Sequence, residues 1–382
     1  MIKIVTITGA RPQIIKAAAI SRAIKNNFAD KIKEVIVHTG QHYDENMSAV
    51  FFTELGIPQP AYNLNVGSGS HAIQTAAMIK GIEEILKKEK PNALVLYGDT
   101  NSTLAGAIVG SKMNVPVIHI EAGLRSFNKQ MPEEINRIAC DQASTLLFSP
   151  TKAGFDNLVK EGFKADTKIP YNADNPKIYH CGDVMYDNSL YFAEVAEKKS
   201  KAMELYGLKK NNFILATIHR DSNTDIPERL NALFSALFEI HQKNNIPVIL
   251  PLHPRTKKYL PENLDKKLLK EITNSKQFII CEPLSFLDMV LLEKNCSLVM
   301  TDSGGVQKEA FYFRKPCIIL RPETEWVELL AYNAAILADA NKKKILDAYT
   351  HFSKEMIIDF PDLFGDGHAS EFICNEIVKH FS

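Results

Sequence analysis

The sequence predicts an α/β protein made of two doubly wound domains, and three observations lead to this fold class. The first half of the 382-residue chain alternates short Val- and Ile-rich runs with amphipathic stretches of helix length, and the alternation begins again after residue 210. Strands that alternate with helices favour βαβ units and a parallel sheet. The segment 170–189 is rich in Asn, Asp, Pro and Tyr, which is typical of a crossing segment near a domain boundary. A chain of this length also exceeds one ordinary core.

The expected elements follow one another along the chain. We expect strands where short apolar runs end at turn residues, and helices where apolar residues recur with helical spacing. In the first half the expected strands are 2–7, 34–38, 93–97 and 117–120, and the expected helices are 14–26, 46–55, 73–88 and 102–113. In the second half the expected strands are 213–217, 247–250, 278–280, 297–300 and 317–320, with a helix at 227–243. In such a pair of domains a ligand binds in the cleft where the carboxyl ends of the strands face each other.

The charge balance and the cysteines exclude several kinds of partner. Lys plus Arg equals Asp plus Glu at 45 each, so no global field attracts nucleic acid or a membrane surface. No segment has the length of a membrane span, and the first residues enter a strand pattern without the features of a signal peptide. Six cysteines lie in apolar surroundings without the spacing of a metal site. We therefore expect a cytoplasmic protein with reduced thiols, no metal, and no nucleic-acid or membrane partner.

An anion site is predicted where an apolar run ends within residues 298–309, which read Leu-Val-Met-Thr-Asp-Ser-Gly-Gly-Val-Gln-Lys-Glu. A buried strand that leads through a glycine turn into a helix points backbone N–H groups at a bound phosphate. Gly304 and Gly305 form the turn, Ser303 adds a hydroxyl donor, and Glu309 is a candidate for binding ribose hydroxyls. The alternative is an ordinary strand-to-helix turn with a solvated glutamate.

Other polar residues follow the expected strands of the first half. Arg11 and Lys16 come after the first strand, Asp99 follows the strand at 93–97, and Glu121 follows the strand at 117–120. These loops lie at the carboxyl ends of strands, where this architecture places functional groups. Acids gathered in one cleft repel each other, which raises the pKa of at least one and permits paired acid and base roles in removing a proton from carbon.

Further candidates begin a helix or follow a strand of the second half. Glu133 and Glu134 fall in the first turn after Pro132, where an acidic side chain interacts favourably with the helix dipole. We expect one of the two to have only this role at the helix start. His219 and Arg220 follow the first strand of the second half, and basic loops on one side of a sheet favour an anion. The chain lacks Gly-x-Gly-x-x-Gly after its first strand and lacks Gly-x-x-x-x-Gly-Lys-Ser/Thr, which disfavours a dehydrogenase or a P-loop kinase.

Ordered motifs give the chain a family likeness. They are Gly-Ala-Arg-Pro-Gln at 9–13 with Lys16, Gly40-Gln41-His42, Gly98-Asp99-Thr100, Glu121-Ala122-Gly123-Leu124-Arg125, Pro132-Glu133-Glu134 with Asn136-Arg137, His219-Arg220, Thr301-Asp302-Ser303-Gly304-Gly305 with Gln307 and Glu309, and Thr324-Glu325. With these motifs, from residue 1 to about 370, the chain resembles the non-hydrolysing UDP-N-acetylglucosamine 2-epimerases.

The resemblance implies a fold and an assembly. It implies two Rossmann-like domains in a GT-B arrangement, with the active site in the interdomain cleft, and it implies a homodimer. The implied domains are 1–175, which a C-terminal helix at about 368–382 joins, and 176–367, which binds UDP. A role in supplying activated sugars for bacterial surface polysaccharide is also implied.

The resemblance further implies reversible epimerisation at C2 of a UDP-sugar, with no cofactor. A base removes the C2 proton as UDP departs from C1, which leaves a 2-acetamidoglucal, and UDP re-adds after a proton returns to the opposite face. Which carboxylate is base and which is acid stays open. The implied catalytic residues are Asp99, Glu121, Glu133 and His219, and the implied substrate-binding residues are Arg11, Lys16, Arg220, Ser303, Gly304, Gly305, Glu309 and Arg321.

Departures from the family pattern leave the sugar open. Ala10 and Gln13 replace the Thr and Glu of many members that act on UDP-N-acetylglucosamine, and Leu284, Met289 and Trp326 also differ. These residues resemble the branch that epimerises UDP-2,3-diacetamido-2,3-dideoxyglucuronic acid. A uronate would need an extra cation, for which the candidates are Arg125, Lys129 and Arg255. The motifs also leave open a GT-B glycosyltransferase, a hydrolysing relative and a non-catalytic nucleotide-sugar sensor.

Overall fold

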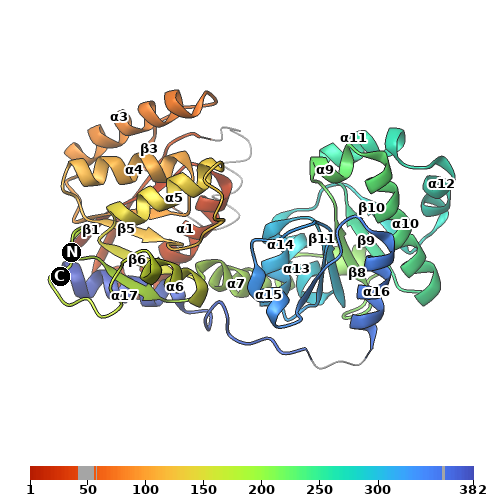
Figure 1. The fold of residues 1–382 in the computed structure, drawn as a ribbon. Helices are drawn as coiled ribbons and strands as arrows, with labels where there is room; N and C mark the ends of the chain where they lie inside the picture. The colour runs from red at the N-terminus through yellow and green to blue at the C-terminus, as the bar shows by residue number, and fades with distance from the viewer. Residues whose placement is uncertain (42–55, 57, 355–357) are drawn as a thin grey trace. The chain divides into compact units, whose positions relative to one another are not determined.

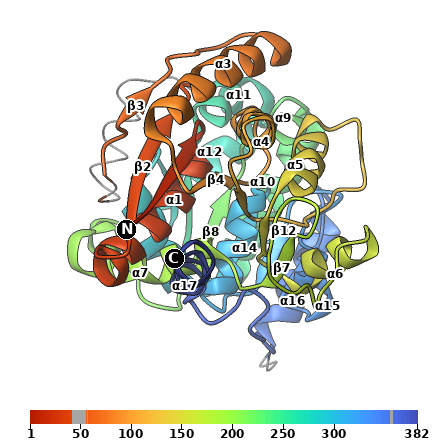
Figure 2. The same ribbon diagram turned by 90° about the vertical axis from the view of Figure 1, so that its left-hand side faces the viewer.

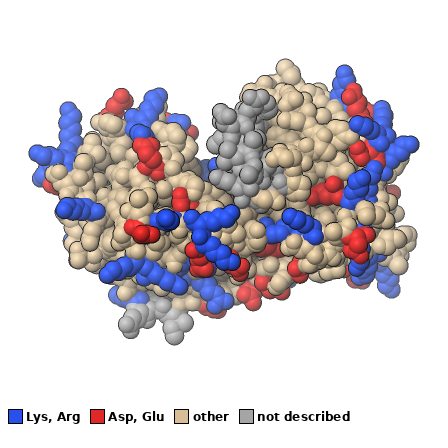
Figure 3. Space-filling model, turned by 180° about the vertical axis from the view of Figure 1, so that it is seen from behind, with Lys and Arg blue, Asp and Glu red and all other residues tan. Residues whose placement is uncertain are grey.

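A computed structural model describes residues 1–41, 56, 58–354 and 358–382, and the chain divides into two compact units (Figure 1). Unit 1 comprises Met1–Asn188 and Asp362–Ser382, and unit 2 comprises Ser189–Pro361. The predicted helix at 46–55 and the motif residue at position 42 lie outside the described residues. No described helix is long and apolar enough to cross a membrane. Basic and acidic side chains are interspersed over the face in Figure 3, in keeping with the net charge of zero.

Unit 1 is built on a seven-stranded sheet in which all described pairs are parallel. The strand order is β3-β2-β1-β4-β5-β6-β7. The chain therefore reverses its direction of winding between β1 and β4, which is the switch point where ligands bind in doubly wound folds. The strands are β1 (Ile2–Thr8), β2 (Ile32–His38), β3 (Tyr62–Asn63), β4 (Ala93–Tyr97), β5 (Val117–Ile120), β6 (Leu146–Ser149) and β7 (Lys177–His180).

Helices cover both faces of this sheet because successive side chains of a strand point to opposite faces. In β1, Ile4 packs in a core with α1 (Arg11–Ala23), η1 (Ile24–Phe28) and the C-terminal helix α17 (Ala369–Phe381). Val5 packs on the other face with α3 (His71–Glu89), α4 (Asn101–Lys112) and α5 (Pro132–Ala143). Helix α17 lies beside α1, so the end of the chain belongs to unit 1 (Figures 1 and 2).

The sequence-based boundary at 175/176 differs from the division of the structure at 188/189. Strand β7 pairs with β6, with Lys177 opposite Leu146, and so extends the first sheet. The segment 170–189 therefore supplies a strand and the start of α7 (Val184–Lys199) to unit 1, where the sequence suggested only a crossing segment. Helix α6 (Lys152–Lys160) precedes this segment in unit 1.

Unit 2 repeats the same design with a six-stranded parallel sheet of order β10-β9-β8-β11-β12-β13. Its switch point lies between β8 and β11. The strands are β8 (Ile214–Thr217), β9 (Val248–Pro251), β10 (Phe278–Cys281), β11 (Leu298–Thr301), β12 (Cys317–Ile319) and β13 (Ala335–Leu337). The helices are α8 (Ala202–Leu205), α9 (Asp221–Thr224), α10 (Pro227–Asn244), α11 (Pro254–Asn263), α12 (Lys266–Asn274), α13 (Phe286–Asn295), α14 (Gly304–Tyr312), α15 (Val327–Ala331) and α16 (Lys342–Ser353).

The two sheets confirm the predicted fold class. The predicted strands at 93–97 and 117–120 are β4 and β5, and those of the second half correspond to β8 through β12. Strands β3, β6, β7 and β13 were not expected. Three of these four form an outer strand of a sheet, where the pattern of buried apolar residues is weakest.

Candidate active site

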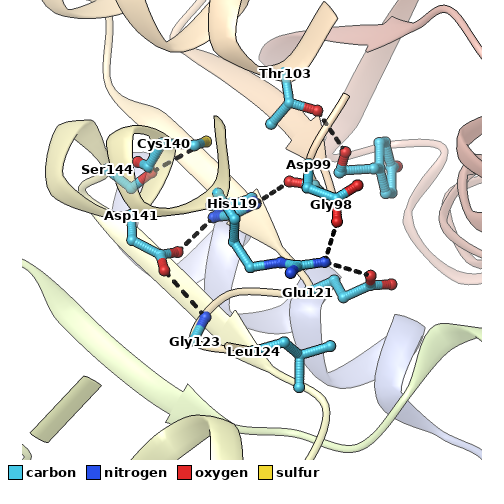
Figure 4. Close-up of polar contacts among 12 residues, drawn as sticks. Gly98, Asp99, Thr103, His119, Glu121, Gly123, Leu124, Cys140, Asp141 and Ser144 are labelled. Carbon is cyan, nitrogen blue, oxygen red and sulfur yellow. Dashed lines mark hydrogen bonds and ion pairs between the residues drawn. The ribbon is translucent and has the colours of Figure 1, made fainter. Parts of the chain in front are cut away.

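The loops after β4 and β5, together with helices α1 and α5, bring four charged side chains together at the carboxyl edge of the first sheet. Lys16 on α1 forms a salt bridge with Glu121, and Arg137 on α5 pairs with Asp99. The Arg137 Nη2 atom also lies 3.6 Å from a carboxylate oxygen of Glu121. Figure 4 shows Asp99 and Glu121 on neighbouring loops. The cluster therefore holds two acids and two cations at the switch point, where the sequence predicted Lys16, Asp99 and Glu121.

The Asp99 carboxyl has an altered acidity in this cluster. Burial raises its pKa above the ordinary value, Arg137 and Lys16 act to lower it, and the carboxylates of Glu121 and Glu133 add to the rise. The net result is a raised pKa. A carboxyl of this kind exchanges a proton closer to neutral pH than an ordinary aspartate does, which suits a group that takes up or returns a proton.

Glu133 and Glu134 at the start of α5 have different roles. The Glu134 carboxylate is buried and accepts hydrogen bonds from the backbone N–H groups of Ser126 (2.8 Å) and Phe127 (3.0 Å). Glu133 is exposed and acts electrostatically on Asp99. Glu134 is therefore the residue that binds the preceding loop at Ser126 and Phe127 to the start of α5, and Glu133 is the one whose charge acts on Asp99.

The backbone around Glu121 adopts a conformation that few side chains tolerate. Glu121 has φ +75°, and Gly98 and Gly123 have φ +60° and +80°. A Cβ atom at Gly123 would lie 2.2 Å from the carbonyl oxygen of Gly154, so only glycine fits there. A non-glycine residue at positive φ is strained, and it keeps this conformation only where hydrogen bonds and packing around it hold the backbone in place. The backbone N–H groups of Glu121 and Ala122 both donate to the Phe148 carbonyl at 3.0 Å.

The departure at Gln13 has a structural explanation. Its side chain is 2% exposed, and its oxygen accepts hydrogen bonds from the backbone N–H groups of Gly9 (2.9 Å) and Ala10 (3.2 Å). Its amide nitrogen donates to the Tyr97 carbonyl (2.9 Å) and the Thr103 hydroxyl (3.0 Å). Gln13 therefore connects the loop after β1 to the end of β4 through hydrogen bonds. Because this role is structural, the presence of Gln at this position says little about which sugar the protein binds.

Arg125 is unsuitable as an extra cation for a uronate, which corrects one expectation. Its side chain is 1% exposed, and its guanidinium contacts Asp141 at 2.7 Å and Glu161 at 2.6 Å. Arg255 pairs with Asp225 and is more exposed, and Lys129 lies in an exposed loop. The first-loop residue Arg11 is also exposed, at the first position of α1.

Asp302 organises the loops at the switch point of unit 2. Its carboxylate is fully buried and accepts hydrogen bonds from the backbone N–H groups of His219 (3.0 Å) and Arg220 (3.0 Å) and from the Asn223 amide (3.0 Å). The predicted pair His219 and Arg220 after β8 is thereby held against the loop after β11. Burial lowers the pKa of the His219 imidazole, Asp302 opposes this, and His253, Arg220 and Arg321 reinforce it.

The predicted anion site lies at the start of α14. Ser303 is the N-cap, and its hydroxyl accepts from the Val306 N–H at 3.5 Å. Gly304 and Gly305 are the first two helical residues, so their N–H groups belong to the helix terminus that favours anions. Arg321 lies nearby, with its Nη1 atom 3.7 Å from the point where a Gly304 Cβ would be and 3.0 Å from the Glu325 carboxylate.

The segment after Arg321 is fastened to α14. The Thr324 hydroxyl donates to Gln307 at 2.6 Å, and the Trp326 indole donates to the Gly304 carbonyl at 3.0 Å. Glu309 lies on α14 and is half-buried. The carboxyl of Glu293 on α13 is fully buried; its burial raises its pKa, and the charge of Glu309 raises that pKa further. Unit 2 therefore brings Ser303, Gly304, Gly305 and Arg321 to one helix start.

The sequence assigned no catalytic or substrate-binding role to Arg137, His119, Asp141 or Asp302. Arg137 and Asp302 stand within the quoted motifs, so a signal existed. His119 and Asp141 lie inside a strand and a helix, where a sequence alone shows only a core position. Among the described residues, no group of three or more His, Cys, Asp or Glu is arranged to hold a metal ion.

Comparisons with known proteins agree with this geometry. Residues 24–378 match the family model described as UDP-N-acetylglucosamine 2-epimerase. A Pseudomonas aeruginosa protein named UDP-2,3-diacetamido-2,3-dideoxy-D-glucuronate 2-epimerase is 47% identical over 378 residues, which cover 99% of each chain. A Methanocaldococcus jannaschii protein named UDP-N-acetylglucosamine 2-epimerase is 41% identical over 371 residues, which cover 97% of each chain. The crystal structure of Methanocaldococcus jannaschii UDP-GlcNAc 2-epimerase in complex with UDP-GlcNAc and UDP has a TM-score of 0.79 and 40% identity, and the match covers 99% of this chain and 100% of that one.

Proposed function

As this chain belongs to the UDP-N-acetylglucosamine 2-epimerase family, we propose that it interconverts the gluco and manno forms of a UDP-N-acetylglucosamine-type sugar at C2. The enzyme class is an isomerase. The reaction proceeds by elimination and re-addition of UDP. The observation that carries the proposal is the cluster of Lys16, Asp99, Glu121 and Arg137 at the switch point of unit 1. Removing a proton from carbon needs a positioned general base, a role that a carboxylate can fill, and nearby cations stabilise the negative charge that develops.

Unit 1 supplies the acid–base groups in this proposal. Asp99, Glu121 and Glu133 handle the C2 proton and the charge that develops as UDP leaves. Support for Asp99 comes from its raised pKa, which burial causes and which the neighbouring carboxylates increase. Lys16 and Arg11 neutralise charge on the substrate side, since both lie on the first turns of α1 after β1.

Unit 2 supplies the nucleotide site. The backbone N–H groups of Gly304 and Gly305 and the Ser303 hydroxyl bind the diphosphate at the start of α14, with Arg220 and Arg321 as counter-charges. Glu309 accepts the ribose hydroxyls. The proposed role of His219 is to contact the leaving diphosphate. Its support is the loop position fixed by Asp302.

A second sugar is favoured by a specific observation. The relative named UDP-2,3-diacetamido-2,3-dideoxy-D-glucuronate 2-epimerase is 47% identical over nearly the whole chain. Trp326, one of the departures from the family pattern, contacts the start of the anion-binding helix through Gly304. The same C2 chemistry on a diacetamido uronate is therefore the alternative within this proposal.

The assembly and the cellular role belong to the same proposal. The family resemblance supports a homodimer and a role in surface polysaccharide synthesis. The six cysteines, all free, support a reducing compartment such as the cytoplasm.

A product analysis tests the function and names the sugar. The purified chain is incubated separately with UDP-N-acetylglucosamine and with UDP-2,3-diacetamido-2,3-dideoxyglucuronic acid, and the products are separated by anion-exchange chromatography. We expect one tube to approach a mixture of gluco and manno UDP-sugars without net release of UDP. Stoichiometric free UDP with a free sugar would indicate a hydrolysing enzyme, and turnover only after adding an acceptor would indicate a glycosyltransferase.

A further inference from the structure

A buried carboxylate on α5 connects the two loops that carry Asp99 and Glu121, although the proposed reaction does not use it. Asp141 is fully buried. One of its oxygens lies 2.7 Å from the His119 Nδ1 atom. The other accepts a hydrogen bond from the Gly123 N–H at 3.2 Å and contacts the Arg125 guanidinium at 2.7 Å. Figure 4 shows Asp141 between His119 and Gly123.

The partners of His119 determine its protonation. Its Nε2 atom lies 2.8 Å from the Gly98 carbonyl oxygen, which can only accept. Its Nδ1 atom lies against a carboxylate that already accepts from Gly123 and Arg125, so this partner also accepts. This arrangement favours donation by both ring nitrogens, that is, an imidazolium. Burial acts to lower the pKa of His119, but Cys140 and Asp141 outweigh it and raise the pKa to about 10.

This pair fixes the backbone at both catalytic loops. Gly98 directly precedes Asp99, and Gly123 follows Glu121 by two residues. His119 binds the first loop through the Gly98 carbonyl, and Asp141 binds the second through the Gly123 N–H. Glu121 has φ +75°, a strained conformation that needs such fixed neighbours.

Other residues of helix α5 also contact the loops that carry Asp99 and Glu121. Glu134 binds the backbone at Ser126, Asn136 donates to the Asp99 carbonyl at 2.9 Å, and Arg137 pairs with the Asp99 carboxylate. Residues 134, 137 and 141 are spaced by three and four, so they share one face of the helix. Asp141 lies at the far end of this row, and it binds the backbone of the second loop directly and that of the first loop through His119.

We propose that His119 and Asp141 form a buried ion pair that positions the Asp99 and Glu121 carboxylates relative to each other. The inference rests on the proposed catalytic roles of Asp99 and Glu121. His119 and Asp141 act as positioning residues, since the His119 ring contacts the Gly98 carbonyl and the Asp141 carboxylate contacts the Gly123 N–H. A misplacement of about 1 Å in a catalytic group costs on the order of 10²-fold in rate, so loss of the pair should appear in turnover.

The test compares two isosteric variants in the full-length chain. Asp141→Asn removes the ion pair, and Asp187→Asn is the matched control. Asp187 is also a buried carboxylate of unit 1, and it accepts from the Ala369 N–H (3.2 Å), the Ser370 N–H (2.7 Å) and the Ser370 hydroxyl (2.6 Å) on α17. For each variant, kcat, KM, UDP affinity by calorimetry and the unfolding midpoint are measured with the sugar that the wild type turns over.

We expect Asp141→Asn to lower kcat on the order of 10²-fold with UDP affinity unchanged, whereas Asp187→Asn lowers only the unfolding midpoint. Unchanged kcat in folded Asp141→Asn would overturn the inference. A wild type without epimerase activity would instead overturn the proposed function, so the two failures are distinguishable.

A measurement on the unaltered chain covers the case in which Asp141→Asn does not fold. In ¹⁵N-histidine-labelled wild type, we expect one of the eleven imidazoles to remain doubly protonated at about pH 8, where ordinary histidines are neutral. The groups facing His119 are Cys140, Asp141 and, through Asp141, Arg125. If every imidazole is neutral at that pH, the buried ion pair does not exist.

Discussion

Arg137 on α5 pairs with Asp99 at the end of β4, and the pair lies at the switch point of the first sheet. The guanidinium lowers the pKa of the Asp99 carboxyl against burial, which raises it. Arg137 also lies 3.6 Å from Glu121, so one cation is shared between two candidate catalytic carboxylates.

Replacing Arg137 by Gln should move one limb of the pH–rate profile. Without the guanidinium, burial and the carboxylates of Glu121 and Glu133 act on Asp99 with less opposition, so the pKa of Asp99 rises further. We expect the limb of the kcat profile that reports Asp99 to shift to higher pH. Lys152→Gln is the control, since Lys152 forms an exposed ion pair with Asp156 within helix α6. Equal profiles for wild type and Arg137→Gln would contradict the coupling.

Removing either central carboxylate should abolish turnover without loss of the nucleotide site. We expect Asp99→Asn and Glu121→Gln to lower kcat by about 10²–10⁴-fold, the range for a general acid or base. Both variants should bind UDP with wild-type affinity in calorimetry, because the proposed UDP contacts belong to unit 2. Loss of UDP binding in both variants would show that these residues were assigned the wrong role.

The neighbouring glutamates of α5 should separate stability from catalysis. Glu134→Gln removes an ionised acceptor of two backbone N–H groups, and we expect a loss of about 1–3 kcal/mol in the free energy of unfolding. Glu133→Gln alters an exposed side chain that acts on Asp99, so we expect lower kcat at unchanged stability. Chemical denaturation and steady-state kinetics on both variants check this. The reverse pattern would exchange the two roles.

Glu34 should make unit 1 less stable as pH rises. Burial raises the pKa of this carboxyl, and hydrogen bonds from Ser21 (2.6 Å) and Thr6 (2.7 Å) only partly offset it. An acid whose pKa is raised on folding contributes stability that is present below its ordinary pKa of about 4.3 and is lost as pH rises through the folded value. Glu34→Gln mimics the protonated side chain.

We therefore expect the urea midpoint of wild type to fall more steeply than that of Glu34→Gln as pH rises above the ordinary glutamate pKa of about 4.3. The comparison at each pH isolates this one group, since all other titrating residues are shared. Parallel curves for the two proteins would show that Glu34 does not contribute.

The loops that follow strands could be predicted from the sequence, whereas their supports could not. Asp99, Glu121 and His219 come directly after short apolar runs, so periodicity alone places them at the carboxyl edge of a sheet. Asp141 occupies a helix interior, and its role depends on a loop 18 residues away in the chain. Only the structure shows such a contact.

The sequence also does not show which charged side chains of unit 1 are buried. Glu133 and Glu134 both favour a helix start, and which one turns inward depends on the phase of α5 against the loop at Ser126. Arg125 has the charge expected of a substrate contact, but it is 1% exposed between Asp141 and Glu161. Charge and spacing do not report burial.

Deuterium exchange at C2 is the decisive measurement for epimerisation through removal of the C2 proton. Wild-type protein is incubated in deuterated water with each candidate UDP-sugar, and proton NMR follows the C2 signal of substrate and product. We expect deuterium to enter C2 as the manno-configured UDP-sugar forms, because the C2 proton passes to carboxylates that exchange with solvent before UDP re-adds. Formation of the manno product with its C2 proton fully retained, or no exchange with either sugar, would contradict it.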